Sequence, residues 1–195
     1  MNIEVSEAPI ATVGELARVS IAFTVDRACE VSASRAGVGA FVLSEHPIAA
    51  PYVKDYDCVS GEGPAQWAGR FDTSNWGFIR AQSNGRLMGG AVIAFRTENV
   101  AMLEARTDLA VLWDIRVSPD VRRQGVGSAL FRAAEAWAVA KGCRQLKIET
   151  QNINVVACRF YARHGCAVRA IHRFAYPELP NEVQLLWYKD LAVPR

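Results

Sequence analysis

Hydrophobic and polar positions follow a clear period only from Gly77 onward. Two apolar runs, Gly77–Gln82 and Leu87–Phe95, are separated by the tetrapeptide Ser-Asn-Gly-Arg at 83–86. Asparagine and glycine both tolerate a positive φ, so the Asn-Gly pair is typical of the tight turn in a β-hairpin. The pattern predicts two antiparallel strands joined by this turn.

A regular alternation of strands and helices is predicted after this hairpin. The predicted strands are Leu109–Val117, Gln145–Thr150, Ala167–Phe174 and Val183–Lys189, and the predicted helices are about Gly125–Lys141 and Asn154–His164. Alternation along the first of these strands places Asp114 and Arg116 on one face. This order predicts a mixed α/β (α+β) sheet with helices packed on it.

The first third of the chain has a weaker pattern. Val13–Ile21 has helical spacing and predicts a short helix. Glu30–Ser34 and Ala40–Ser44 are predicted as short strands on either side of a glycine turn at 37–39. Pro47–Pro64 lacks a period and is expected to be a long loop. Further along, the polar segment Arg96–Asp108 fits either a short helix or an extended turn.

Length and charge narrow the class of protein. A chain of 195 residues is long enough for one domain with a full core, so we expect residues 1–195 to form a single domain. The formal net charge of +2 gives no global field for nucleic acid, and no such partner is expected. No apolar run reaches the ~18–20 residues that span a bilayer. The acidic start of the chain is unlike a secretory signal, so we expect a cytoplasmic protein without a membrane partner.

The cysteine pattern favours neither disulfides nor a metal. The five cysteines are Cys29, Cys58, Cys143, Cys158 and Cys166. Their number is odd and no two have CxxC spacing, which argues against a disulfide framework and a zinc site. We therefore expect thiols and no metal.

A glycine-containing segment between a predicted strand and a predicted helix has the chemistry of an anion site. It reads Arg122-Arg123-Gln124-Gly125-Val126-Gly127. Glycine lets the backbone approach a ligand, and the first turn of a helix offers N–H groups and the positive end of its dipole. The segment predicts a pyrophosphate site, with a helix-capping turn that binds nothing as the alternative.

Two other phosphate-binding motifs do not fit this segment. A dinucleotide fingerprint needs a third glycine where Leu130 stands, and a P-loop needs Gly-Lys followed by Ser or Thr. Neither nucleotide-binding class is therefore predicted.

Two segments resemble the signature elements of the GNAT acetyltransferases. Residues 114–130, DIRVSPDVRRQGVGSAL, are similar to the family's strand, proline turn and Arg/Gln-x-x-Gly-x-Gly/Ala helix start. Residues 154–165, NVVACRFYARHG, are similar to its Asn-x-x-Ala-x-x-Phe-Tyr-x-x-x-Gly-Phe element, although Cys166 replaces the phenylalanine. Four shorter pieces resemble streptothricin (nourseothricin) acetyltransferases, namely residues 23–27, 51–56, 149–154 and 181–188.

The resemblance implies a fold and a cosubstrate. The GNAT fold has a central, mixed, mostly antiparallel twisted sheet of six to seven strands, splayed in the middle and flanked by helices. The cosubstrate would be acetyl-CoA, with the pantetheine arm along one strand and the pyrophosphate on the glycine turn. The implied cofactor-binding residues are Ile115, Arg116, Val117, Arg122, Arg123, Gln124, Gly125, Val126, Gly127, Ser128, Asn154, Ala157 and Tyr161.

The resemblance also implies catalytic roles. Tyr161 matches the tyrosine that protonates the leaving thiolate, and the N–H of Val117 matches the oxyanion donor. Glu149 is favoured as general base and Asp114 stands second, with a salt-bridged surface carboxylate or an anchor for a cationic acceptor as alternatives for each. Covalent catalysis by Cys158 is disfavoured because no histidine has suitable spacing.

The expected function is acetyl transfer from acetyl-CoA to a primary amine of a small cationic molecule. Streptothricin is the favoured acceptor, which would make the protein an antibiotic-resistance enzyme. Two alternatives stay open: another amine, such as an aminoglycoside, a polyamine or a peptide amino terminus, and a non-catalytic acyl-CoA-binding sensor on the same fold. A homodimer is also left open, with the edge of the final strand as the pairing surface.

Overall fold

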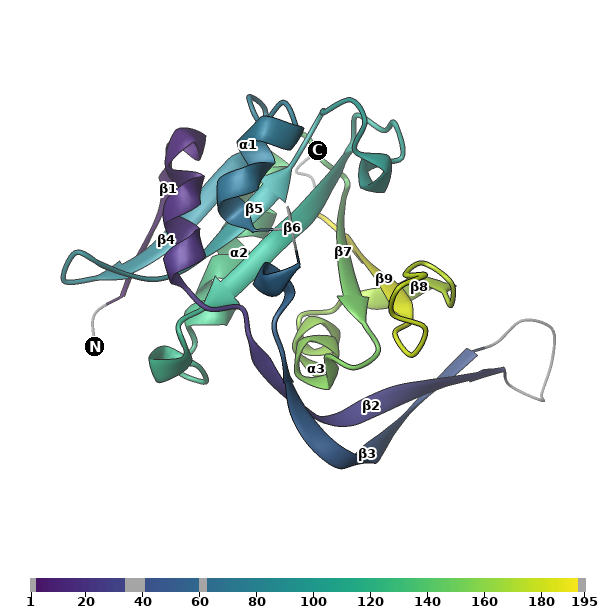
Figure 1. Cartoon of the computed structure of the whole chain (residues 1–195). Coiled ribbons are helices and arrows are strands. Elements are labelled where there is room, and N and C mark those ends of the chain that lie inside the picture. Colours follow the sequence, from purple (N-terminus) through teal and green to yellow (C-terminus); the bar gives the residue numbers. More distant parts are fainter. Residues whose placement is uncertain (1–2, 34–40, 60–62, 193–195) are drawn as a thin grey trace. The chain divides into compact units, whose positions relative to one another are not determined.

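The structure, a computed structural model, describes residues 3–33, 41–59 and 63–192 (Figure 1). Its residues divide into two compact units. The first unit comprises Met1–Ala22, Asp55–Ile148 and Lys189–Arg195, and the second comprises Phe23–Lys54 and Glu149–Tyr188. Strands β7 (Gln145–Gln151) and β9 (Gln184–Asp190) each contribute residues to both units.

The first unit contains four antiparallel strands and one parallel pairing. Strands β1, β4, β5 and β6 pair antiparallel in that order, and β6 pairs in parallel with the beginning of β7. The strands span Glu4–Ala8 (β1), Gly77–Ser83 (β4), Arg86–Ala94 (β5) and Leu109–Val117 (β6). The α-helices are α1 (Trp67–Arg70) and α2 (Val126–Ala140), and the 3-10 helices are η1 (Ile10–Arg18), η2 (Tyr56–Cys58), η3 (Pro64–Gln66), η4 (Ala101–Leu103) and η5 (Pro119–Val121).

Helix α2 and η1 cover opposite faces of this sheet. Gly89 and Gly90 are neighbours on β5, so side chains at these positions would point to opposite faces. A Cβ atom on Gly89 would lie 3.3 Å from Leu130 of α2, whereas one on Gly90 would lie 2.9 Å from Leu16 of η1. The two glycines thus let both layers approach the strand closely.

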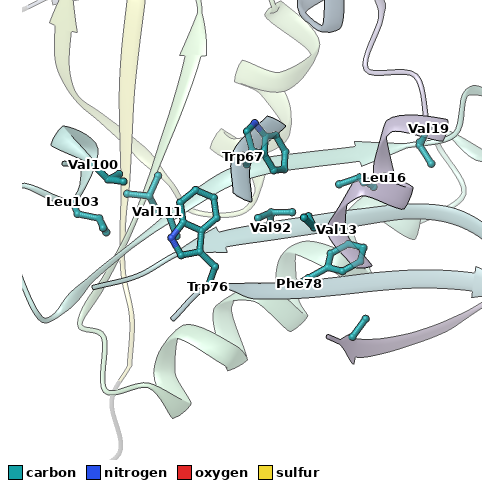
Figure 2. Close-up of a cluster of buried hydrophobic side chains, with 12 residues drawn as sticks. Val13, Leu16, Val19, Trp67, Trp76, Phe78, Val92, Val100, Leu103 and Val111 are labelled. Atoms are coloured by element: carbon teal, nitrogen blue, oxygen red, sulfur yellow. The ribbon is translucent and has the colours of Figure 1, made fainter. Parts of the chain in front are cut away.

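The apolar core on the η1 face of the first unit is drawn in Figure 2. Side chains from η1, α1 and the sheet meet there: Val13, Leu16, Val19, Trp67, Trp76, Phe78, Val92 and Val111 are all buried. Each large side chain of this kind stabilises the fold by about 1.5–3 kcal/mol relative to exposure. Trp76 also donates its indole N–H to Thr97 Oγ1 at 2.7 Å, so its polar atom is satisfied.

The second unit contains a long two-stranded sheet, a helix and a further strand pair. β2 (Phe23–Ala33) pairs antiparallel with β3 (Phe41–Lys54), and β8 (Ala167–His172) pairs antiparallel with β9. The helix α3 spans Val155–Arg163. The strands other than β2 and β3 follow the hydrogen-bonded order β1-β4-β5-β6-β7-β9-β8. The predicted class, a mixed and mostly antiparallel sheet of six to seven strands with helices, is confirmed.

The predicted hairpin and the elements that follow it agree with the structure. Asn84 has a φ of 50° and Gly85 a φ of 75°, as the tight turn requires. The strand predicted over Leu109–Val117 has these bounds, and the other predicted strands and helices after residue 120 agree within two residues at each end. Arg96–Asp108 turns through the short helix η4.

The first third of the chain departs further from the prediction. β1 was missed, because its five residues show little apolar alternation and only Ala8 is buried. The helix expected at Val13–Ile21 is the 3-10 helix η1, which begins and ends three residues earlier. The short strands expected at Glu30–Ser34 and Ala40–Ser44 are parts of the longer β2 and β3. The turn placed at 37–39 lies outside the described residues.

The loop predicted over Pro47–Pro64 is wrong in its first half. β3 continues to Lys54, and short 3-10 helices follow it. Most side chains of β3 are exposed, so the strand lacks the apolar alternation that sequence patterns detect. Pro47 and Pro51 also suggested a loop, but proline is tolerated at a strand edge that donates no ladder bond. β3 has such an edge among the described strands, since its sheet is two-stranded.

The proposed pairing surface for a homodimer is also wrong. The final strand β9 lies between β7 and β8 in the sheet, so it is not an edge strand. A second copy therefore cannot extend the sheet through β9. In the described part of the chain, no helix is long and apolar enough to span a membrane.

Candidate active site

The glycine segment forms a turn that opens α2 in the first unit. Gly125 is the N-cap residue with a φ of 87°, and Arg123 also has a positive φ, of 63°. The N–H of Ala129 closes the first α-helical bond, onto Gly125 O at 3.0 Å. The backbone N–H groups that precede it stand at the positive end of the helix dipole. This geometry suits an anion of the pyrophosphate type.

The two arginines of this turn have different surroundings. Arg122 donates to three backbone carbonyls, those of Val117 (3.0 Å), Ala22 (2.9 Å) and Ser20 (3.0 Å). Burial lowers the pKa of its guanidinium. Arg123, in contrast, is exposed. The structure therefore gives Arg122 a role in holding the turn, whereas the side chain of Arg123 stands in solvent.

Strand β6 has one side of its backbone turned away from β5. Successive N–H groups of a strand point in opposite directions, and Ser118 donates to Met88 O of β5 at 2.8 Å. The N–H of Val117, and with it that of Ile115, therefore points away from β5. The parallel pairing of β6 with β7 runs from Leu109–Gln145 to Leu112–Ile148, and β6 continues beyond it. A cosubstrate could add to this strand in the manner of an extra strand.

Asp114, the second choice for general base, is paired with Arg116 on the same face of β6. The Nε and Nη2 atoms of Arg116 lie 2.9 and 2.6 Å from the two carboxylate oxygens of Asp114. Arg116 also contacts Asp57, at 2.5 Å between Nη1 and Oδ2, and Val19 O, at 3.1 Å. Burial raises the pKa of Asp114 and Arg116 opposes this change, while the pKa of Arg116 is raised because both carboxylates outweigh its desolvation. Asp114 is thus part of a buried ion pair.

Glu149, the favoured base, belongs to the second unit and has neutral partners. The Tyr176 hydroxyl donates to Glu149 Oε1 at 2.5 Å, and Gln184 Nε2 donates to Oε2 at 2.8 Å. Gln151 Nε2 donates to the Tyr176 hydroxyl oxygen at 3.0 Å and lies 3.5 Å from Glu149 Oε1. Burial and the negative charge of Glu149 raise the pKa of Tyr176, so the phenol stays protonated and remains a donor.

Sequence reasoning did not find the partners of Glu149. The i, i+2 spacing of Glu149 and Gln151 on β7 was visible, because alternate residues of a strand share a face. Tyr176 and Gln184 lie 27 and 35 residues further along the chain. Only the position of β9 beside β7 brings them to Glu149.

The second signature segment forms α3 and its cap. Asn154 accepts a hydrogen bond from the N–H of Ala157 at 3.1 Å through its side-chain oxygen, which makes it the N-cap residue. Tyr161 lies on the buried side of α3 and is 5% exposed. Its ring centroid lies 6.3 Å from that of Trp187, which donates to Thr150 Oγ1 at 2.8 Å. Tyr161 is therefore held by packing within the second unit.

Cys158 has the properties of a structural thiol. It is buried, it lies 3.7 Å from Thr150 Oγ1, and it shares a hydrogen bond with the thiol of Cys29. That bond and burial raise the pKa of Cys158, whereas the pKa of Cys29 is lowered by the same bond. A protonated, buried thiol is a poor nucleophile.

The site residues from the sequence thus fall into two groups. Asp114, Ile115, Arg116, Val117 and residues 122–128 lie together in the first unit, whereas Glu149, Asn154, Ala157 and Tyr161 lie in the second. Among the residues that the structure describes, no three His, Cys, Asp or Glu side chains could hold a metal ion together.

Comparison with known proteins identifies the class to which this fold and these motifs belong. Residues 44–166 match the acetyltransferase (GNAT) family, and the chain belongs to this family. Streptothricin acetyltransferase A of Bacillus subtilis (strain 168) is 30% identical over 159 residues, which cover 77% of this chain and 80% of the relative. The chain is accordingly an N-acetyltransferase.

Two solved structures share the fold over nearly the whole chain. A nourseothricin acetyltransferase has a TM-score of 0.74 at 22% identity, with 100% of both chains covered. A Bacillus anthracis str. Ames protein assigned as a streptothricin acetyltransferase, in complex with acetyl coenzyme A, has a TM-score of 0.75 at 22% identity and covers 97% of this chain and 100% of its own. At this level of identity the likeness establishes the fold.

Proposed function

We propose that this protein transfers the acetyl group of acetyl-CoA to a primary amine of a small cationic molecule, and that streptothricin is the acceptor. The observation that carries the proposal is the Glu149 carboxylate, whose hydrogen-bond partners among the described residues are neutral. Its negative charge is not balanced by any of these partners, so it can attract an ammonium group and accept a proton. The name of the Bacillus subtilis relative supports streptothricin as the acceptor.

The first unit would hold the cosubstrate. The pantetheine arm would lie along Ile115, Arg116 and Val117, whose backbone has one side turned away from β5. The pyrophosphate would bind the backbone N–H groups of residues 124–128 at the start of α2. Arg123 would add positive charge from solvent, while Arg122 keeps the turn in place. By the resemblance, Asn154 would contact the pantetheine or the adjoining backbone, and Ala157 stays a predicted cosubstrate-binding residue.

The reaction would proceed by direct attack. Glu149 accepts a proton from the ammonium of the acceptor, and the nitrogen lone pair attacks the thioester carbonyl carbon. The N–H of Val117 donates to the oxyanion of the tetrahedral intermediate. When the tetrahedral intermediate collapses, the C–S bond breaks and the thiolate of coenzyme A takes the hydroxyl proton of Tyr161. The amide nitrogen loses its second proton, which restores the Tyr161 hydroxyl, and Glu149 releases its proton to solvent. Asp114 is less suited to the base role because Arg116 engages both of its oxygens.

An acetyltransferase for another amine would differ from one for streptothricin only on the acceptor side of the site. Aminoglycosides, polyamines and peptide amino termini stay open as alternatives, because the Glu149 carboxylate would attract the protonated amine of any of them. A non-catalytic sensor is set aside because the chain belongs to a family of acetyltransferases. That residues 1–195 form a single domain and that the protein is cytoplasmic remain predictions, and a homodimer stays an open alternative.

A thiol-release assay tests the proposed function. Purified protein is incubated with acetyl-CoA and, in parallel, with streptothricin, spermidine, an aminoglycoside or a peptide, and free coenzyme A is measured over time. We expect rapid release with streptothricin and slow release with the others, above the background without acceptor. If coenzyme A is released only with another amine, the acceptor belongs to the class of that amine. If no amine causes release, the proposal is contradicted.

A further inference from the structure

Both oxygens of the Glu149 carboxylate are fixed by donors from outside its own strand. Tyr176 comes from the connection between β8 and β9 and bonds Oε1 at 2.5 Å, and Gln184 comes from β9 and bonds Oε2 at 2.8 Å. The terminal torsion of a glutamate side chain is otherwise broad. Two donors on different oxygens therefore restrict the plane of the carboxylate. Gln151 Nε2 also lies 3.5 Å from Oε1, so Oε2 is the oxygen that keeps a further lone pair for an incoming amine.

The Tyr176 hydroxyl is itself oriented. Its oxygen accepts a hydrogen bond from Gln151 Nε2 at 3.0 Å, so its own proton is directed to Glu149. The phenol is half-buried, which limits competition from water for that proton. The chain of donors runs from Gln151 through Tyr176 to Glu149 in one direction.

The connection that carries Tyr176 is tied down within the second unit. Glu182, 5% exposed, pairs with Lys54 at the end of β3 at 2.5 Å. Val183 exchanges two hydrogen bonds with Asn152, at 2.8 and 3.0 Å. Tyr176 O accepts from the N–H of Leu179 at 2.9 Å, which closes a turn next to the phenol. These contacts therefore hold the segment that carries the Tyr176 phenol in place.

We infer that Tyr176 and Gln184 are positioning residues for the reaction, which hold the Glu149 carboxylate in the orientation that receives the proton of the acceptor amine. This inference rests on the proposed role of Glu149 as general base. Neither residue needs to touch the acceptor or acetyl-CoA. Their contribution would be to keep the base in one geometry, because a reacting group must be held close to its productive orientation by the residues around it.

The test compares pH–rate profiles of Tyr176→Phe and Gln184→Met with that of the wild type, using the acceptor amine that gives activity. Tyr176→Phe keeps the ring and removes only the donor. We expect kcat to fall roughly tenfold or more, as for the loss of one hydrogen bond to a charged group. We also expect the KM for acetyl-CoA to be unchanged, so that the loss falls on kcat. Gln184→Met should act in the same direction.

Two controls separate the possible failures. Tyr52→Phe makes the same chemical change on exposed β3 and should leave kcat and the profile unchanged. Glu149→Gln tests the base itself: wild-type turnover in that variant would overturn the proposed mechanism and the inference with it. If Glu149→Gln is impaired while Tyr176→Phe and Gln184→Met both retain the wild-type profile, only the positioning role is overturned. If either Tyr176→Phe or Gln184→Met fails to fold, as judged by circular dichroism, the kcat of the other variant tests the positioning role.

Discussion

Arg116 binds both oxygens of Asp114 from two positions further along the same strand, at 2.9 and 2.6 Å. Both side chains are almost wholly buried, and Asp57 contributes a second carboxylate to the guanidinium. Because a charge left without its partner inside a protein is costly, this pair stabilises the first unit only while it is complete.

Asp114→Asn should destabilise the protein by about 3 kcal/mol, the lower end for a broken buried ion pair, since Asp57 still contacts Arg116. The measurement is chemical denaturation followed by circular dichroism. Asp120→Asn is the matched control, because Asp120 pairs with Arg86 on the surface and such pairs contribute little. Equal losses in the two variants would contradict a special role for the buried pair.

Gly89→Ala should also lower stability, through crowding between β5 and β6. A Cβ atom on Gly89 would lie 2.5 Å from the backbone oxygen of Arg116, and a backbone atom cannot move aside cheaply. We expect a loss of about 1–3 kcal/mol, as for overpacked cores. Gly69→Ala in α1 is the control, because a Cβ there meets nothing within 4 Å and alanine favours a helix. A melting temperature unchanged by Gly89→Ala would refute this prediction.

Substitution of Arg122 should affect the stability of the protein, whereas substitution of Arg123 should affect cosubstrate binding. Arg122→Ala removes three bonds to backbone carbonyls, so we expect a lower melting temperature and a disturbed turn. Arg123→Ala removes an exposed charge, so we expect an unchanged melting temperature and a KM for acetyl-CoA raised severalfold. Thermal melts and initial rates at varied acetyl-CoA measure both quantities. If neither variant has a raised KM for acetyl-CoA, the turn is not part of the cosubstrate site.

Tyr161→Phe should lower turnover with little change in acetyl-CoA affinity. The ring keeps its packing against Trp187, and only the hydroxyl that would protonate the thiolate is lost. Loss of a general acid lowers kcat by about a hundredfold or more. Steady-state rates and equilibrium binding of acetyl-CoA distinguish the two effects. Unchanged turnover would exclude Tyr161 from the mechanism.

The cysteines should react in the order of their exposure, and none should be required for turnover. Cys58 is exposed and should be modified first by a thiol reagent at pH 7. Burial raises the pKa of Cys143 to about 11, so this thiol stays protonated at pH 7 and should react only on unfolding. Cys158→Ala should retain kcat within about twofold, since direct transfer uses no thiol of the enzyme. A large loss of kcat in a folded Cys158→Ala protein would favour covalent catalysis.

Much of the chain from Gly77 onward could be predicted because its signals are local. The Asn84-Gly85 turn depends on the φ that these two residues tolerate, and the turn before α2 depends on Gly125. Apolar periodicity over one strand or helix was enough to place β6 and α3. β1 and the part of β3 after Pro47 were not predicted for the same reason. Their own residues carry little apolar alternation, and pairing with β4 and β2 makes them strands.

The sequence by itself determined the family motifs, the alternation of strands and helices and the residues that enter the candidate site. Only the tertiary structure decided what each of those side chains bonds. It brought Asp57 to Arg116, turned Arg122 to the carbonyl of Ala22 and brought Tyr176 and Gln184 to Glu149. Periodicity and φ preferences act over a few residues, whereas contacts between residues 27 to 102 positions apart depend on strand order and loop path.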